Sequence, residues 1–144
     1  MTIIIKPVES DAEWRQYFDL RWRVLRAPWG EAEGTEKDDI EADCHHIIAC
    51  ESTRVVGVGR LQFNDEQQAQ IRYMAVAPDC EGRGIGRRIV SALEQYARLQ
   101  NAAEIVLDAR EPAVGFYRRL GYEVIEKSYL LFDSIQHWRM RKIL

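Results

Sequence analysis

A glycine-rich turn between a strand-like and a helix-like segment is the strongest constraint on how this chain can fold. Gly82, Gly84 and Gly86 lie at alternate positions after a strand predicted over residues 70–77, which Pro78 ends. A helix follows at once, because apolar residues recur at helical spacing at Ile85, Ile89, Leu93, Tyr96 and Leu99. Glycines permit positive φ and close approach of a ligand, and the free N–H groups of a helix start attract anions. The segment therefore predicts a phosphate-binding turn, with further contacts from Arg83, Arg87 and Arg88.

The two common nucleotide-binding loops do not fit this turn. The pattern Gly-x-x-x-x-Gly-Lys-[Ser/Thr] is absent, because Arg87 and Arg88 follow the last glycine. The dinucleotide pattern Gly-x-Gly-x-x-Gly fails at its third glycine, because Arg87 stands at that position. A nucleotide-binding protein is therefore disfavoured. A flexible strand-to-helix connection without a ligand stays open on this pattern alone.

The remaining periodicity predicts a single α+β domain over residues 1–144, in which helices pack on a largely antiparallel sheet. A helix capped by Ser10 or Asp11 is predicted to end at Pro28–Gly30, and another to run from Pro112 to Gly121. A short helix is predicted within the acidic segment 31–43. Strands are predicted at 3–6, 46–50, 54–63, 70–77, 104–108, 122–125 and 136–143.

Composition and charge exclude several classes of protein. The apolar fraction of 47% and the charged fraction of 30% are those of a globular chain. No apolar run approaches the roughly 20 residues of a membrane helix, and the N-terminus is not a secretion signal, so we expect a cytoplasmic protein without membrane contact. The net charge of −3 gives no general attraction for nucleic acid. Cys44, Cys50 and Cys80 have no zinc or redox spacing, and a site at Cys44, His45 and His46 lacks a second half, so we expect free thiols and no metal.

Two segments resemble the signatures of the GNAT N-acetyltransferase superfamily. Glu81-Gly-Arg-Gly-Ile-Gly86 is similar to its acyl-CoA motif Gln/Arg-x-x-Gly-x-Gly/Ala, with Glu81 as a departure at the first position. Ala113-Val-Gly-Phe-Tyr-Arg-Arg-Leu-Gly-Tyr122 is similar to the downstream motif of the same family. Within the superfamily, the chain resembles ElaA-like proteins and the acetyltransferase-like half of bacterial GNAT–thioesterase fusions. The resemblance covers nearly the whole chain and implies a mixed, largely antiparallel sheet of six to seven strands flanked by about four helices.

The resemblance also implies a reaction and a set of site residues. The expected reaction moves an acetyl group from acetyl-CoA to an amine by direct attack within a ternary complex. Main-chain groups of Met74 and Val76 would bind the pantetheine arm, and Tyr117 would act as general acid. The pyrophosphate would bind Glu81, Gly82, Arg83, Gly84, Ile85, Gly86 and Arg87. A Glu81 side chain facing the pyrophosphate would weaken this binding by like-charge repulsion.

The acceptor site is predicted from residues on the first helical region and the central strands. Trp22, Arg60, Arg72 and His46 are the candidates, and the two arginines suggest a carboxylate-bearing acceptor. The general base stays open between His46, His137 and a water chain. The acceptor is expected to be a small-molecule or peptide amine.

Two other functions remain compatible with the sequence. A non-catalytic acyl-CoA-binding module, acting as a sensor or as a thioesterase partner, would bind CoA without transferring an acyl group. A toxin-like acetyltransferase of aminoacyl-tRNA would need a basic face, which the net charge of −3 does not favour. The C-terminal edge strands make a homodimer plausible.

Overall fold

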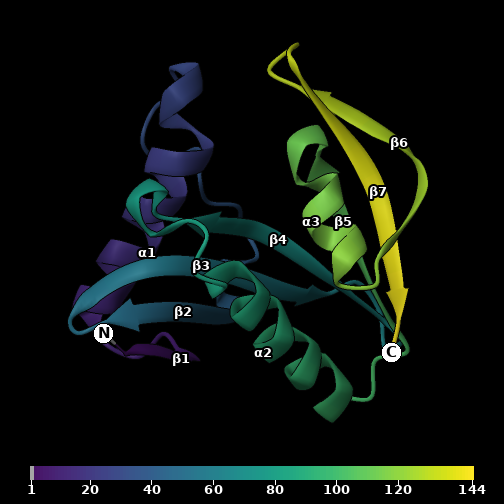
Figure 1. The fold of residues 1–144 in the computed structure, drawn as a ribbon, viewed down its shortest axis with the longest axis horizontal. Helices are drawn as coiled ribbons and strands as arrows, with labels where there is room; N and C mark the ends of the chain where they lie inside the picture. Colours follow the sequence, from purple (N-terminus) through teal and green to yellow (C-terminus); the bar gives the residue numbers. More distant parts are fainter. Residues whose placement is uncertain (1) are drawn as a thin grey trace.

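Seven strands of residues 2–144, the part of the chain described by the computed structural model, form one mixed sheet in the order β1-β2-β3-β4-β5-β7-β6 (Figure 1). Every neighbouring pair is antiparallel except β4 and β5, which are parallel. This confirms the α+β class and the largely antiparallel sheet. The strands are β1 (Ile3–Pro7), β2 (His45–Glu51), β3 (Arg54–Phe63), β4 (Gln68–Val76), β5 (Glu104–Arg110), β6 (Glu123–Leu131) and β7 (Ile135–Ile143).

The α-helices of the described residues are α1 (Asp11–Leu25), α2 (Ile85–Leu99) and α3 (Val114–Arg119). Ser10 caps α1: its hydroxyl accepts from the Glu13 N–H at 3.1 Å, and the Glu13 carboxylate accepts from the Ser10 N–H at 3.1 Å. Short 3₁₀ turns supplement the helices at Ala27–Trp29, Glu41–Asp43, Pro78–Cys80 and Glu111–Ala113. The helix expected within 31–43 is thus reduced to a single 3₁₀ turn.

The helices α1 and α2 cover opposite faces of the sheet. A Cβ atom on Gly59 would lie 2.7 Å from Cγ2 of Ile89, so this face of β3 receives α2. The next residue, Arg60, points the other way and lies over the Tyr73 ring, where Arg21 of α1 also packs. Successive side chains of a strand alternate between the two faces, which places α1 opposite α2.

A bulge interrupts β4 opposite Gly59. Val58 pairs with Ala75 and Arg60 pairs with Arg72, so Tyr73 and Met74 together oppose the single residue Gly59. Tyr73 has a φ of +58°, a conformation that costs a non-glycine residue on the order of 1 kcal/mol and needs support from its surroundings.

Guanidinium groups on the face covered by α1 support this bulge. The guanidinium carbon of Arg21 lies 3.7 Å from the Tyr73 ring centroid, and those of Arg60 and Arg72 each lie 4.8 Å from it. Arg21 and Arg60 are both 0% exposed, and their charges are met by Glu41 and Asp38. Packing therefore holds the strained residue in place.

The parallel strands β4 and β5 separate toward their carboxyl ends. Their pairing runs only from Gln68–Glu104 to Ile71–Leu107, although β4 continues to Val76 and β5 to Arg110. β5 pairs instead with β7 over its full length. The divergence opens the sheet between the ends of β4 and β5.

The last hairpin is longer than the sequence predicted. β6 extends to Leu131, whereas the expected strand ended at Ile125. β6 is an edge strand that pairs only with β7 and shifts register at two places, so its exposed polar residues hide the alternation expected of a strand.

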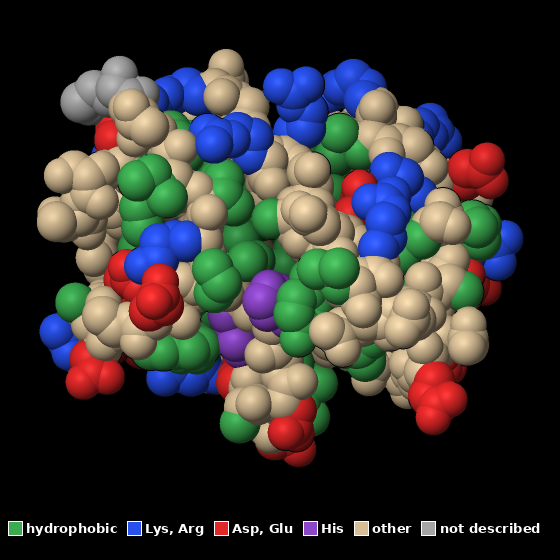
Figure 2. Space-filling model, turned by 90° about the horizontal axis from the view of Figure 1, so that it is seen from below, with side chains coloured by type: hydrophobic (Ala, Val, Ile, Leu, Met, Phe, Trp, Pro, Cys, Tyr) green, Lys and Arg blue, Asp and Glu red, His purple; other side chains and the backbone are tan. Residues whose placement is uncertain are grey.

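The surface mixes both signs of charge. Figure 2 shows Lys and Arg scattered with Asp and Glu among hydrophobic and other side chains over one face. Among the described helices, none is long and apolar enough to cross a membrane.

Candidate active site

The glycine-rich turn adopts the left-handed backbone that its sequence predicts. Gly82 has a φ of +78° and Gly84, the residue that precedes α2, has a φ of +75°. No side chain caps α2, and its first internal hydrogen bond runs from the Arg88 N–H to the Gly84 carbonyl oxygen at 3.2 Å. The earlier N–H groups of this 15-residue helix are therefore available to a ligand.

Gly86 connects the turn to the second sequence motif. A Cβ atom at this position would lie 3.2 Å from Cζ of Phe116, which is tighter than ordinary van der Waals contact. Tyr117 is the next residue in the chain, and the centroids of the Phe116 and Tyr117 rings lie 4.9 Å apart. The glycine therefore lets α3 approach the start of α2 closely, which places the glycine-rich turn near Tyr117.

Charged side chains surround the turn without closing it. Arg83 pairs with Glu51 at 2.6 Å, and this hydrogen bond raises the pKa of Arg83 and lowers that of Glu51. Arg87, Arg88 and Glu81 are largely exposed. The turn thus keeps basic side chains at its rim, together with the one carboxylate that departs from the family motif.

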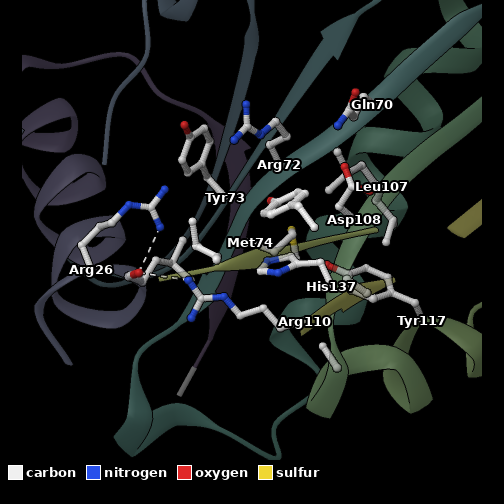
Figure 3. Close-up of a pocket in the computed structure, with 16 residues that line it drawn as sticks. Arg26, Gln70, Arg72, Tyr73, Met74, Leu107, Asp108, Arg110, Tyr117 and His137 are labelled. Atoms are coloured by element: carbon white, nitrogen blue, oxygen red, sulfur yellow. Dashed lines mark hydrogen bonds between the residues drawn. The ribbon is translucent and has the colours of Figure 1, made fainter. Parts of the chain in front are cut away.

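A cavity of about 130 Å³ lies where β4 and β5 diverge (Figure 3). Its walls come from β4, β5, α3, β6 and β7, and from the end of α1. Its polar lining includes Arg26, Arg72, Asp108, Arg110, Tyr117 and His137.

Tyr117 brings a protonated hydroxyl to this cavity. The residue is only 7% exposed, and its hydroxyl has no protein hydrogen-bond partner among the described residues. That oxygen is nevertheless not sealed from solvent, unlike the buried unpaired Nε atoms of Arg21 and Arg60. Burial raises the pKa of the Tyr117 phenol, so the group stays protonated at neutral pH.

His137 also lines the cavity, and its Nε2 has no hydrogen-bond partner among the described residues. Its Nδ1 lies 3.0 Å from the carbonyl oxygen of Ile135, which can only accept, so Nδ1 carries the proton and Nε2 has the lone pair. The ring stacks on Tyr129 with centroids 4.3 Å apart. Burial lowers the pKa of His137, which keeps the ring neutral.

The structure brings one of the predicted acceptor residues into this cavity and separates the others. Arg72 lines it. Arg60 is fully buried in ion pairs with Asp38 and Glu41, and Trp22 donates to the Glu31 carbonyl oxygen on another surface.

His46 also lies outside the cavity. Its Nε2 donates to the Glu41 carbonyl oxygen at 2.7 Å, and its Nδ1 accepts from the Tyr17 hydroxyl at 2.6 Å. Both ring nitrogens are thus occupied in the core, and burial is the main cause of its lowered pKa.

Arg26 and Arg110 line the cavity but were not among the predicted acceptor residues. Arg110 is the last residue of β5, the buried strand that follows α2 in the chain. Its place just after the predicted strand 104–108 was the signal that could have identified it as a cavity residue. Arg26 follows α1 and is brought to the cavity only by tertiary packing.

Comparison with known proteins agrees with this architecture. The model of the Acetyltransferase (GNAT) family matches residues 14–122. The uncharacterized N-acetyltransferase YjcF of Bacillus subtilis is 31% identical over 134 residues, which cover 93% of this chain and 95% of that protein.

Solved structures share the fold over the whole chain. A GNAT family acetyltransferase from Elizabethkingia anophelis with acetyl-CoA bound has a TM-score of 0.78 at 15% identity, covering 99% of this chain and 98% of that one. Escherichia coli ElaA, from the group to which the sequence motifs pointed, has a TM-score of 0.77 at 18% identity, covering 98% and 99%. The paired motifs, the diverging strands and these matches show that the chain belongs to the GNAT acetyltransferase family.

Proposed function

We propose that this chain transfers an acetyl group from acetyl-CoA to an amine by direct attack in a ternary complex. The proposal rests on one observation: the uncapped N-terminus of α2 and the solvent-accessible hydroxyl of Tyr117 lie at the same opening of the sheet. Phe116 joins the two, because it contacts the glycine turn and precedes Tyr117. The related structure with acetyl-CoA bound, which shares the fold, supports the choice of cofactor.

The cofactor would be held mainly by main-chain groups. The N–H groups of Ile85, Gly86 and Arg87 make no bond within α2 and face the left-handed turn, which suits a pyrophosphate. Met74 belongs to the bulge and Val76 lies just after it, beyond the part of β4 that pairs with β5, and their main-chain groups would bind the pantetheine arm. Acetyl-CoA supplies an activated thioester acyl group at this point.

Two side chains of the cavity would handle the protons. His137 would accept a proton at Nε2 from the attacking amine, because its Nδ1–H is committed to the main chain. Tyr117 would hold a proton at its hydroxyl for the departing thiolate. Each group begins in the protonation state that its role requires at neutral pH.

Titration with acetyl-CoA, followed by thiol release against a pooled amine library, tests the proposal. We expect saturable binding and amine-dependent release. Tyr117→Phe should keep the affinity for CoA but lower kcat by about 100-fold or more. Tyr122→Phe is the matched control, because this buried phenol bonds Glu94 at 2.8 Å outside the cavity.

Two outcomes would contradict the proposal. Binding without release from any amine pool would support the non-catalytic module. Equal kcat values for Tyr117→Phe and the unmodified protein would remove the general-acid role.

A further inference from the structure

Two guanidinium groups in the acceptor cavity converge on one carbonyl oxygen. Arg26 Nη1 and Arg110 Nη2 each donate to the main-chain oxygen of Leu25, and both distances are 3.0 Å (Figure 3). Neither guanidinium forms an ion pair with a carboxylate of the described residues. Arg26 also donates from Nε to the main-chain oxygen of Thr35 at 3.0 Å, so the two like charges are met by neutral carbonyl oxygens alone.

The rest of the cavity lining does not neutralise these charges. Asp108, its single carboxylate, is engaged by Arg139 at 3.0 Å and by the Ser128 hydroxyl at 2.8 Å. Arg72 adds a third guanidinium, held only loosely at 3.5 Å from Asp38. The cavity therefore carries excess positive charge.

This arrangement is unfavourable for the protein by itself. Burial is the main cause that lowers the pKa of Arg110, and the nearby charge of Arg26 lowers it further. Two half-buried cations side by side without a carboxylate add nothing to the stability of the protein, whereas an incoming anion would relieve both effects.

Aromatic rings fix the two guanidiniums in orientation. The Arg110 group lies over the Trp29 ring at 4.6 Å, and the Arg26 group lies 5.7 Å from both the Tyr73 and Phe132 rings. Stacking engages the flat faces and leaves N–H edges for a planar acceptor.

We infer that the acceptor is a small amine that carries a carboxylate, and that Arg110 and Arg26 bind this carboxylate. A carboxylate has two coplanar oxygens that match the guanidinium edge, and charge-assisted pairs of this kind are the strongest hydrogen bonds in proteins. The cavity volume of about 130 Å³ limits the bound part to a few heavy atoms. The inference rests on the proposed function, because it assigns the second substrate of that reaction.

The test compares amines that carry a carboxylate, a neutral carboxamide or a phosphate. Pooled amino acids with a free α-carboxylate, the same amino acids as α-carboxamides, and O-phosphoethanolamine are assayed for acetyl transfer. We expect kcat/KM for the carboxylates to exceed that for the carboxamides by about 100-fold or more, because an acceptor without the anion leaves both guanidiniums unpaired. Stronger transfer to the phosphate compound would overturn the carboxylate assignment.

Variants locate the binding group. Arg110→Gln should raise KM for the carboxylate acceptors by about 100-fold and abolish their advantage over the carboxamides, while the affinity for acetyl-CoA in calorimetry stays nearly unchanged. Arg110→Lys should recover only part, because an ammonium cannot make the planar double contact. Arg98→Gln, at an exposed arginine of α2 outside the cavity, is the matched control. An unchanged preference in Arg110→Gln would overturn the inference.

A binding measurement separates this inference from the proposed function. Calorimetric titration of the CoA-saturated protein with the same amino acids needs no transfer, and we expect binding that Arg110→Gln abolishes. If carboxylates bind while no amine is acetylated, the proposed function fails and the anion site stands. Equal binding of carboxylates and carboxamides would remove the anion site, whether or not acetyl transfer occurs.

Discussion

Replacement of Glu41 by Gln should destabilise the protein more than any surface charge change. Glu41 accepts from Arg21 through both oxygens at 3.0 and 2.7 Å, and its Oε2 lies 3.0 Å from Nη1 of Arg60. Gln has the same shape but carries no charge and turns an N–H₂ group toward the arginines. Arg21, which is 0% exposed, would then keep a charge without a carboxylate.

The expected loss follows from the geometry of this network. Removing one partner of a buried ion pair costs about 3–5 kcal/mol. Arg60 keeps its two-point contact with Asp38 at 2.7 and 2.8 Å, which places the loss near the lower limit, about 3 kcal/mol. For a domain of this size that corresponds to a fall in Tm of about 10 °C.

Urea unfolding at pH 7 measures the effect directly. Asp19→Asn is the matched control, because the Asp19–Arg23 pair on α1 is exposed and should contribute about 0.5 kcal/mol or less. A loss below about 1 kcal/mol for Glu41→Gln would refute the argument that the buried cations depend on this carboxylate.

The pH dependence of the same difference gives a second test. Burial raises the pKa of Glu41, but its hydrogen bonds and the charge of Arg21 outweigh burial, so the pKa of Glu41 lies below its ordinary value. The hydrogen bond from Arg60 likewise lowers the pKa of Asp38. A lowered carboxyl pKa contributes stability that is present above the ordinary value near 4 and lost as the pH falls through the folded value. The gap between the unmodified protein and Glu41→Gln should therefore shrink below about pH 4, and a constant gap would contradict the assigned cause.

Three further predictions concern packing and the site. Gly59→Ala should lower the free energy of unfolding in urea by about 1–3 kcal/mol, because its Cβ would lie 2.6 Å from Met74 Sδ and 2.7 Å from Ile89 Cγ2. Gly115→Ala has no such close contact and should raise the free energy of unfolding by about 0.5 kcal/mol. Glu81→Gln should tighten CoA binding about threefold by calorimetry if its side chain faces the pyrophosphate, and unchanged affinity would leave only its main chain in contact. His137→Gln should lower kcat by about 100-fold and remove the acidic limb of the pH–rate profile, which we expect below pH 6.5 because the pKa of His137 is lowered; a retained limb would exclude this base.

Sequence patterns predicted those elements whose conformation depends mainly on residues close by in the chain. The Ser10 cap, the glycine turn and the apolar face of α2 are specified by neighbouring residues, and the structure has them, except that Leu99 at the end of that face is 71% exposed. The edge strand β6 was underestimated because it buries little on either face, so its sequence has no strict alternation to detect.

The lining of the candidate cavity was harder to predict because it depends on long-range pairing. Arg60 and Arg72 oppose one another across β3 and β4, yet one is sealed in a core ion-pair network and the other lines the cavity. The residues that flank Arg60 and Arg72 in the sequence do not indicate which arginine is buried and which lines the cavity. The difference comes from Asp38 and Glu41, which lie in an irregular segment that periodicity cannot position.

The short contact between β4 and β5 leaves the alignment of two halves of the chain to few main-chain pairs, and the proposed reaction would depend on that alignment. The glycine turn belongs to the half before residue 100, while Tyr117, His137 and Arg110 belong to the half after it. Only four residue pairs of main chain join those halves within the sheet. A small rotation about this seam would move Tyr117 away from the glycine turn while every strand and helix stayed intact. For the proposed reaction, turnover would therefore report the native alignment more sensitively than any measure of secondary structure, and a ligand that contacts both halves would stabilise that alignment.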